Sequence, residues 1–86
     1  MAAKIVVYTT VPCPYCSHAK ALLSKRGVEF EEISLAKDPD GRDELVRKTG
    51  RMTFPQVIVD DEVIGGYEEV VVADRAGRWK ELAAAA

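Results

Sequence analysis

The sequence predicts an α/β fold in which a four-stranded mixed sheet is flanked by helices. Three observations predict it. Residues 4–35 read as strand, helix and strand, which is a βαβ unit whose two strands run parallel. Two further strands lie close together later in the chain, separated by acidic turn residues, as in a hairpin. The chain has 86 residues, so we expect residues 1–86 to form one domain around one core.

The βαβ unit begins with a short apolar run. Residues 4–9 (KIVVYT) are rich in β-branched side chains and predict a buried strand, which Pro12 ends. A helix is expected over residues 13–26, with Pro14 in its first turn, where the missing N–H is harmless, and Gly27 just after its end. The buried face of this helix consists of residues at helical spacing: Cys16, Ala19, Leu22 and Leu23.

The second strand of the unit is expected over residues 28–35. Its apolar residues change phase at Glu31-Glu32, which predicts a bulge or a twist there. Residues 38–41 (DPDG) form a turn that opens the next helix, and Gly50 ends that helix. Its first turn carries acids and its last turn carries bases, as the helix dipole favours: Asp43, Glu44, Arg47 and Lys48.

The remaining elements follow in quick succession. We expect a strand at 56–59, a turn at 60–62, a returning strand at 63–64, a helix at 67–76 and a short helix at 79–86. Gly65-Gly66 ends the second of these strands, and the run Val70-Val71-Val72 belongs to the core. The order β-α-β-α-β-β-α, followed by the short helix, is the thioredoxin-like arrangement, with helices on both faces of the sheet.

Composition excludes several classes of function. The net charge is −2, with 14 acidic against 12 basic residues, which argues against nucleic-acid binding. No segment approaches the roughly 20 apolar residues of a membrane span, and the N-terminus lacks the apolar region of a secretory signal. We therefore expect a cytoplasmic monomer with no nucleic-acid or membrane partner. A domain of this size also leaves little room for a tightly bound cofactor.

The only two cysteines lie in the segment Cys13-Pro14-Tyr15-Cys16. This segment follows a strand and opens a helix, which is the setting of redox-active C-x-x-C pairs. Unpaired N–H groups at the helix start favour a Cys13 thiolate, the nucleophilic form of the thiol. Cys16 lies one turn later on the buried face, where desolvation keeps it a thiol. We expect Cys13 to be the nucleophile and Cys16 the resolving residue.

Two other interpretations of the cysteines stay open, a zinc site and a pair of buried structural residues. A zinc site needs two further ligands, and the sequence holds a single histidine, His18. His18 is two residues past Cys16, so it does not share that helix face and is expected to be solvated. A disulfide between Cys13 and Cys16 closes too short a loop to stabilise the fold much. Redox chemistry is the better explanation, and no metal site is expected.

Three motifs in this order make the chain resemble the glutaredoxin family, specifically its short bacterial dithiol type. They are Cys13-Pro14-Tyr15-Cys16, Thr53-Phe54-Pro55 and Gly65-Gly66-Tyr67-Glu68-Glu69, and the resemblance covers essentially the whole chain. It implies a glutathione-dependent thiol–disulfide oxidoreductase that reduces protein disulfides and glutathione mixed disulfides. Its partners would then be disulfide-containing or glutathionylated proteins. Glutathione would be a co-substrate, and no cofactor would be tightly bound.

The resemblance also implies a glutathione groove. Phe54, preceding a cis Pro55, would pair its backbone with the cysteinyl part of glutathione. The amides of Tyr67 and Glu68, at the start of a helix, would bind the γ-glutamyl carboxylate, and the Glu68 side chain would bind the ammonium. Arg51 and Tyr15 match the family's contacts to the glycyl end. The implied groove residues are Tyr15, Arg51, Thr53, Phe54, Pro55, Gly66, Tyr67 and Glu68.

Two positions differ from the family pattern. Many relatives have a lysine where this chain has Thr10, and a valine where it has Phe54. Two other activities within the fold also stay open. One is a redoxin that takes electrons from thioredoxin reductase and serves ribonucleotide reductase. The other is a dimeric carrier of a glutathione-ligated 2Fe–2S cluster, which Pro14 disfavours because it stiffens the loop. Thioredoxin itself is disfavoured because no tryptophan lies beside Cys13.

Overall fold

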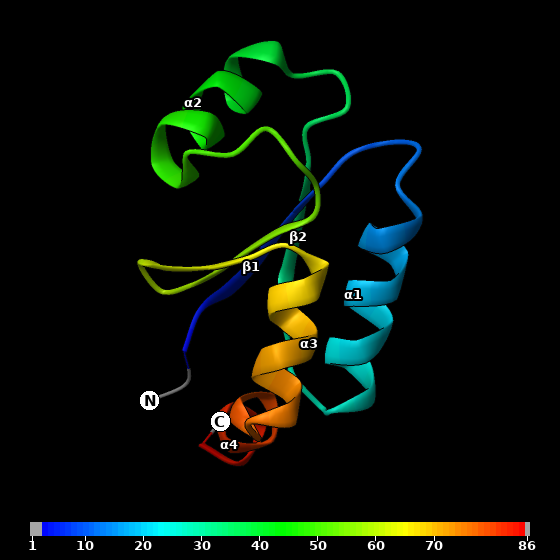
Figure 1. Ribbon diagram of the computed structural model, residues 1–86, viewed down its shortest axis with the longest axis vertical. Helices are drawn as coiled ribbons and strands as arrows, with labels where there is room; N and C mark the ends of the chain where they lie inside the picture. Colours follow the sequence, from blue (N-terminus) through cyan, green and yellow to red (C-terminus); the bar gives the residue numbers. More distant parts are fainter. Residues whose placement is uncertain (1–2, 86) are drawn as a thin grey trace.

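Within residues 3–85, which are those the computed structural model describes, the chain forms strands and helices in the expected order (Figure 1). The strands are β1 (Ile5–Thr9), β2 (Glu31–Ser34), β3 (Gln56–Val59) and β4 (Glu62–Gly65). The helices are α1 (Pro14–Lys25), α2 (Pro39–Thr49), α3 (Tyr67–Arg75) and α4 (Arg78–Ala85). None of these helices is long and apolar enough to cross a bilayer.

The four strands form one mixed sheet in the order β2-β1-β3-β4. β1 and β2 are parallel, as the βαβ unit predicted, and β3 is antiparallel to both β1 and β4. The hairpin between β3 and β4 turns at Asp60 and Asp61, and Asp60 has a positive φ of 53°. The thioredoxin-like fold is therefore confirmed.

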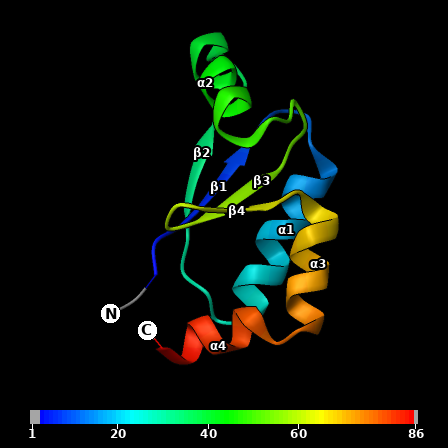
Figure 2. The same cartoon turned by 60° about the vertical axis from the view of Figure 1, so that its left-hand side comes forward.

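The central strand β3 is buried on both sides, because helices cover both faces of the sheet. Val57 and Val59 point to one face, where they pack with side chains of α1, α3 and α4. Ile58 points to the other face and packs with Leu45 of α2. Figures 1 and 2 show α1 and α3 side by side, with α4 beyond their C-terminal ends and α2 on the far side of the sheet.

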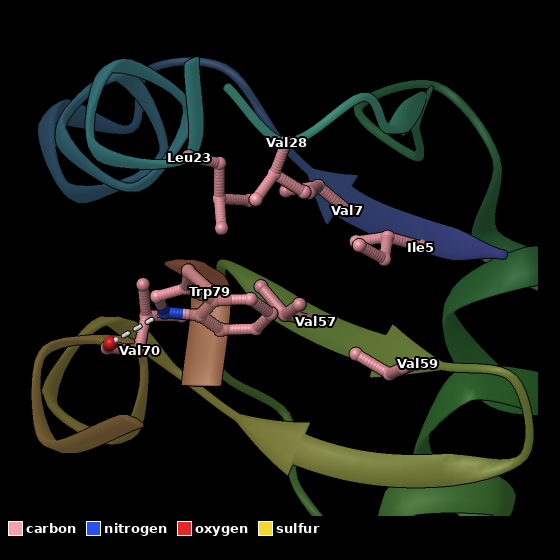
Figure 3. Close-up of a cluster of buried hydrophobic side chains, with 8 residues drawn as sticks. All are labelled: Ile5, Val7, Leu23, Val28, Val57, Val59, Val70 and Trp79. Carbon is pink, nitrogen blue, oxygen red and sulfur yellow. Dashed lines mark hydrogen bonds between the residues drawn. The ribbon is translucent and has the colours of Figure 1, made fainter. Parts of the chain in front are cut away.

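The larger core cluster centres on Trp79, the first buried residue of α4 (Figure 3). Its side chain is fully buried, and its indole N–H donates a 2.9 Å hydrogen bond to the backbone oxygen of Val70. This bond joins α4 to α3 inside the core. Trp79 is thus a packing residue of the core. α4 begins at Arg78, one residue earlier than expected, and Ala86, its predicted last residue, lies outside the described residues.

The predicted strand 28–35 is too long. Only Glu31–Ser34 pair with β1, in an unshifted register from Val6–Glu31 to Thr9–Ser34. Val28 and Leu35 are buried at 6% and 4% exposure without belonging to the strand. The predicted bulge at Glu31-Glu32 is also wrong, because the change of phase marks the point where the connection from α1 becomes a paired strand.

The start of α2 was placed too late. Asp38 is the N-cap, with its carboxylate accepting a 2.9 Å hydrogen bond from the Gly41 amide, and the residues predicted as a turn form the first helical turn. The acid in that turn is Asp40, so Asp43 and Glu44 belong to the second turn. A Cβ at Gly41 would lie 2.5 Å from the Asp38 carboxylate, which explains why a glycine stands inside this helix.

The run Val70-Val71-Val72 is only partly core. Val70 is fully buried, but the Val72 side chain is 63% exposed. Consecutive residues of a helix point about 100° apart, so three in a row cannot all face the sheet. The assignment of Val72 to the core is therefore wrong.

Candidate functional site

The cysteine pair forms a disulfide at the start of α1. Cys13 is the N-cap of the helix, and its sulfur accepts a 3.1 Å hydrogen bond from the amide of Cys16. Pro14 occupies the first turn, where no N–H is needed. Cys16 is buried at 3% exposure, whereas Cys13 is partly exposed. The two sulfurs therefore differ in access, and the accessible one receives a helix N–H.

The electrostatics of this end of α1 favour negative charge on Cys13. The first turn, all of it within the described part of the chain, contains no acidic residue. α1 and α3 begin at the same end of the molecule (Figures 1 and 2), so both positive helix termini lie near the site. Among residues 3–85, no group of three or more His, Cys, Asp or Glu side chains is arranged to hold a metal ion.

A groove of about 490 Å³ brings together every residue that the sequence predicted for a glutathione site. Tyr15 of α1 contributes to it from within the C-x-x-C segment. The stretch from Arg51 to Pro55 contributes a second part, and the start of α3 a third. Its lining residues are Tyr15, Arg51, Thr53, Phe54, Pro55, Gly66, Tyr67, Glu68 and Glu69. Only Glu69 was absent from the predicted set.

The segment before β3 has the backbone geometry that the resemblance implied. The Phe54–Pro55 peptide bond is cis. A second cis bond, Val11–Pro12, precedes the cysteine pair and was not predicted. The start of α3 lies close to this segment, since a Cβ on Gly66 would be 3.4 Å from the backbone oxygen of Pro55. These two segments form two walls of the groove, and they approach each other closely at Gly66.

Glu69 links these two walls. The Arg51 guanidinium donates a hydrogen bond to its carboxylate and holds the pKa of that carboxyl below its ordinary value of 4.5. Burial opposes this shift in part, and the backbone N–H groups of Glu69 and Gly66 add to it. Gly65 has a φ of 120°, and a Cβ there would lie 2.9 Å from Cγ of Glu69. Gly65 thus makes room for the Glu69 side chain.

The carboxylate of Glu69 occupies some of the N–H groups at the start of α3 and leaves two others available. Glu69 is the third residue of α3, and its acid reaches back to the amide of the N-cap residue Gly66. The helix amides of Tyr67 and Glu68 are the remaining first-turn donors. These are the two amides that the resemblance implied for a carboxylate ligand. The sequence signal that could have revealed Glu69 was an acid three residues after an N-cap.

An aromatic cluster borders the groove. The ring of Tyr15 stacks on that of Tyr67 with centroids 5.6 Å apart, and His18 lies 5.9 Å from Tyr67 and 6.3 Å from Tyr15. His18 is exposed, as predicted, but it is in contact with the groove wall rather than isolated. Tyr67 therefore contributes a ring contact as well as a backbone amide.

Gln56 is a second residue that sequence reasoning missed. It is the first residue of β3 and is fully buried, and its side-chain amide donates hydrogen bonds to Thr53. A glutamine at the first position of a strand of valines and isoleucine gave no signal of burial. Its position directly after Pro55 was the only indication of a link to the groove.

Comparison with known proteins agrees with this geometry. The glutaredoxin family model matches residues 5–64. The chain is 42% identical over 81 residues to a glutaredoxin of Pseudomonas aeruginosa, covering 94% of this chain and 96% of the relative. It is 40% identical over 75 residues to glutaredoxin 3 of Escherichia coli, covering 87% of this chain and 90% of the relative.

Solved structures give the same result. A buckwheat glutaredoxin–glutathione complex matches with a TM-score of 0.84 at 29% identity, over 96% of this chain and 78% of that chain. The solution structure of a glutaredoxin from Brucella melitensis matches with a TM-score of 0.82 at 36% identity, over 94% of this chain and 88% of that chain. The family model, the relatives and the solved structures all name glutaredoxins, and this chain has a C-x-x-C pair at a helix start; the chain belongs to the glutaredoxin family of thiol–disulfide oxidoreductases.

Proposed function

We propose that this protein reduces protein disulfides and glutathione mixed disulfides with glutathione as its reductant. The observation that carries the proposal is the groove beside the cysteine pair, which offers a site for each charge of glutathione. Glutathione has two carboxylates and one ammonium. The groove has two helix amides and an arginine for the carboxylates, and the acid of Glu68 for the ammonium. The buckwheat glutaredoxin matched above is itself a complex with glutathione.

The nucleophile is Cys13, because it is the more accessible sulfur and it accepts a helix N–H. Its thiolate attacks the glutathione sulfur of a mixed disulfide, which forms the Cys13–glutathione disulfide and releases the other thiol as the leaving group. A second glutathione thiolate then attacks the glutathione sulfur on Cys13. This releases glutathione disulfide and regenerates the Cys13 thiolate, so each turnover consumes one free glutathione, and the other half of the glutathione disulfide comes from the substrate.

Cys16 acts only on protein disulfides. Attack of Cys13 on a protein disulfide gives a mixed disulfide with the substrate protein. The Cys16 thiol loses its proton and attacks the sulfur of Cys13, which releases the reduced protein and forms the disulfide seen between Cys13 and Cys16. Two glutathione molecules then reduce that disulfide. Burial of Cys16 at 3% exposure suits a thiol that meets only Cys13.

The groove orients glutathione so that its sulfur reaches Cys13. The backbone of Phe54 pairs with the cysteinyl part, beside Thr53 and Pro55. The amides of Tyr67 and Glu68, which follow Gly66, hold the γ-glutamyl carboxylate. Arg51 and Tyr15 hold the glycyl end. Since glutathione is abundant and reduced in the cytoplasm, we place the protein there, acting as a monomer.

The test is a coupled assay on a small glutathione mixed disulfide. One arm supplies glutathione and glutathione reductase, and the other supplies thioredoxin reductase as the electron donor. Turnover in the glutathione arm alone is expected. Turnover only with thioredoxin reductase would contradict the proposal and favour a redoxin that serves ribonucleotide reductase.

A further inference from the structure

The side chain of Gln56 makes an unusual set of contacts for a core residue. It is fully buried, at 0% exposure, at the start of β3, a strand that is buried along its whole length. Its Nε2 donates one hydrogen bond of 2.9 Å to the backbone oxygen of Thr53 and a second of 3.1 Å to the Thr53 hydroxyl. Its Oε1 is also buried and has no hydrogen-bond partner among the described residues.

This arrangement is unfavourable for folding on its own. A buried carbonyl oxygen without a partner destabilises the folded state, because it loses its bonds to water. Methionine has a similar volume and no such oxygen. The orientation of the amide is fixed, because the Thr53 carbonyl can only accept and therefore requires the NH2 group. The orphaned oxygen is the consequence of directing both N–H groups at Thr53.

The contacts of Gln56 tie an exposed segment to the rigid sheet. Thr53 is exposed and lines the groove, whereas Gln56 pairs with Tyr8 of the central strand β1. Phe54 and Pro55 lie between the two. One bond restrains the Thr53 backbone and the other its side chain, so the backbone on both sides of Phe54 is held in place. Gln56 itself is fully buried and is not among the residues that line the groove.

We infer that Gln56 is the positioning residue of the glutathione groove: it holds the segment 53–55 in the conformation that pairs with glutathione, at the expense of an unpartnered buried oxygen. The inference rests on the function proposed above. It explains why a polar residue occupies a site where an apolar one would fold better. Sites that break a folding rule in this way are commonly functional.

The first test is Gln56→Met, which keeps the volume and removes both bonds. We expect KM for a glutathione mixed disulfide to rise on the order of tenfold. The free energy that holds residues 53–55 in the binding conformation falls by about the net contribution of one hydrogen bond, so a smaller fraction of the protein is ready to bind. We expect kcat and the rate of Cys13 alkylation by iodoacetamide to stay close to wild type. The urea midpoint of unfolding should be unchanged or higher, because the orphaned oxygen is gone. A purely structural role predicts the reverse, a lower midpoint with KM unchanged, and would overturn the inference.

The second test is Gln56→Glu, for which the effect on KM should depend on pH. A protonated carboxyl can donate to the Thr53 oxygen, whereas a carboxylate cannot and repels it. The ratio of variant KM to wild-type KM should therefore be near one at low pH and rise as pH increases. For Gln56→Met the ratio should be elevated at every pH. A flat ratio near one for Gln56→Glu would overturn the inference.

The wild-type protein separates this inference from the function on which it rests. If wild type fails to turn over glutathione mixed disulfides, the proposed function is wrong and the inference falls with it. If wild type is active and Gln56→Met has an unchanged KM, only the role of Gln56 is wrong.

Discussion

The acid at the start of α3 gives the sharpest prediction about specificity. Glu68 and Glu69 are adjacent and both line the groove, but only Glu69 is paired with Arg51. The Glu68 side chain is exposed, and the structure gives it no hydrogen bond or ion pair within residues 3–85. Glu68→Gln therefore removes a charge that no internal contact uses, and any large effect must come through a ligand.

The magnitude follows from the exposure of Glu68. A hydrogen bond between charged groups contributes about 1.5–3 kcal/mol, whereas an ion pair in full contact with water contributes about 1 kcal/mol or less. Glu68 is exposed before the ligand binds and partly covered afterwards. We therefore expect a loss near the boundary of the two ranges, about 1.4 kcal/mol, which is roughly tenfold in kcat/KM.

The assay compares two reducing thiols with the same oxidised substrate, a protein disulfide that contains no glutathione. Glu68→Gln should reduce kcat/KM about tenfold with glutathione and hardly at all with cysteamine, which lacks the γ-glutamyl group. The control variant is Glu44→Gln, which removes the same charge from an exposed site on α2, away from the groove. Equal losses with both thiols would show that Glu68 does not recognise the γ-glutamyl ammonium, and Arg51 and Tyr15 would then be the candidates for specificity.

Three further predictions concern stability and the groove. Trp79→Phe removes the buried bond to the Val70 oxygen, so the free energy of unfolding should fall by about 1–3 kcal/mol, and an unchanged urea midpoint would argue against that bond. The free energy of unfolding should also fall at acid pH. Four carboxyls have a pKa in the folded protein below the ordinary values of 3.8 or 4.5. Their pairing therefore stabilises the protein above those ordinary values, and this stabilisation is lost as pH falls through the lower folded pKa. They are Glu32, Glu62, Glu69 and Asp74. Urea midpoints measured from neutral to acidic pH check this, and high salt should flatten the profile. Thr10→Lys, which restores the lysine of many relatives, should lower KM for a glutathione mixed disulfide by up to about fivefold, and a KM that is unchanged or higher would show that this position does not face the ligand.

Much of the fold could be predicted because its signals are local. Each signal determines the structure of residues close to it in sequence. Examples are the β-branched run at residues 4–9, the glycines after the helices and the acids of the hairpin. β1 lies within one residue of its expected bounds, and Gly50 ends α2 in the left-handed conformation. The helix start at Cys13 was predictable in the same way, since Pro14 belongs in a first turn.

The features that were missed depend on contacts between distant parts of the chain. The length of β2 depends on which residues β1 can pair, and the run 28–30 finds no partner there. The pair between Arg51 and Glu69 joins residues 18 apart in sequence, and no local pattern indicates it. The burial of Gln56 likewise depends on the packing of both faces of the sheet. The predicted groove residues were found through the resemblance to a family, and all of them except Arg51 lie within its three motifs.

In the proposed function, Cys13 alone exchanges with glutathione while Cys16 resolves protein disulfides. The most direct measurement is the mass of the Cys16→Ser protein after exposure to glutathione disulfide, followed by turnover assays. We expect one glutathione bound at Cys13, its release by added glutathione, retained reduction of glutathione mixed disulfides and lost dithiol reduction of protein disulfides. Absence of that adduct, or activity in Cys13→Ser, would contradict it.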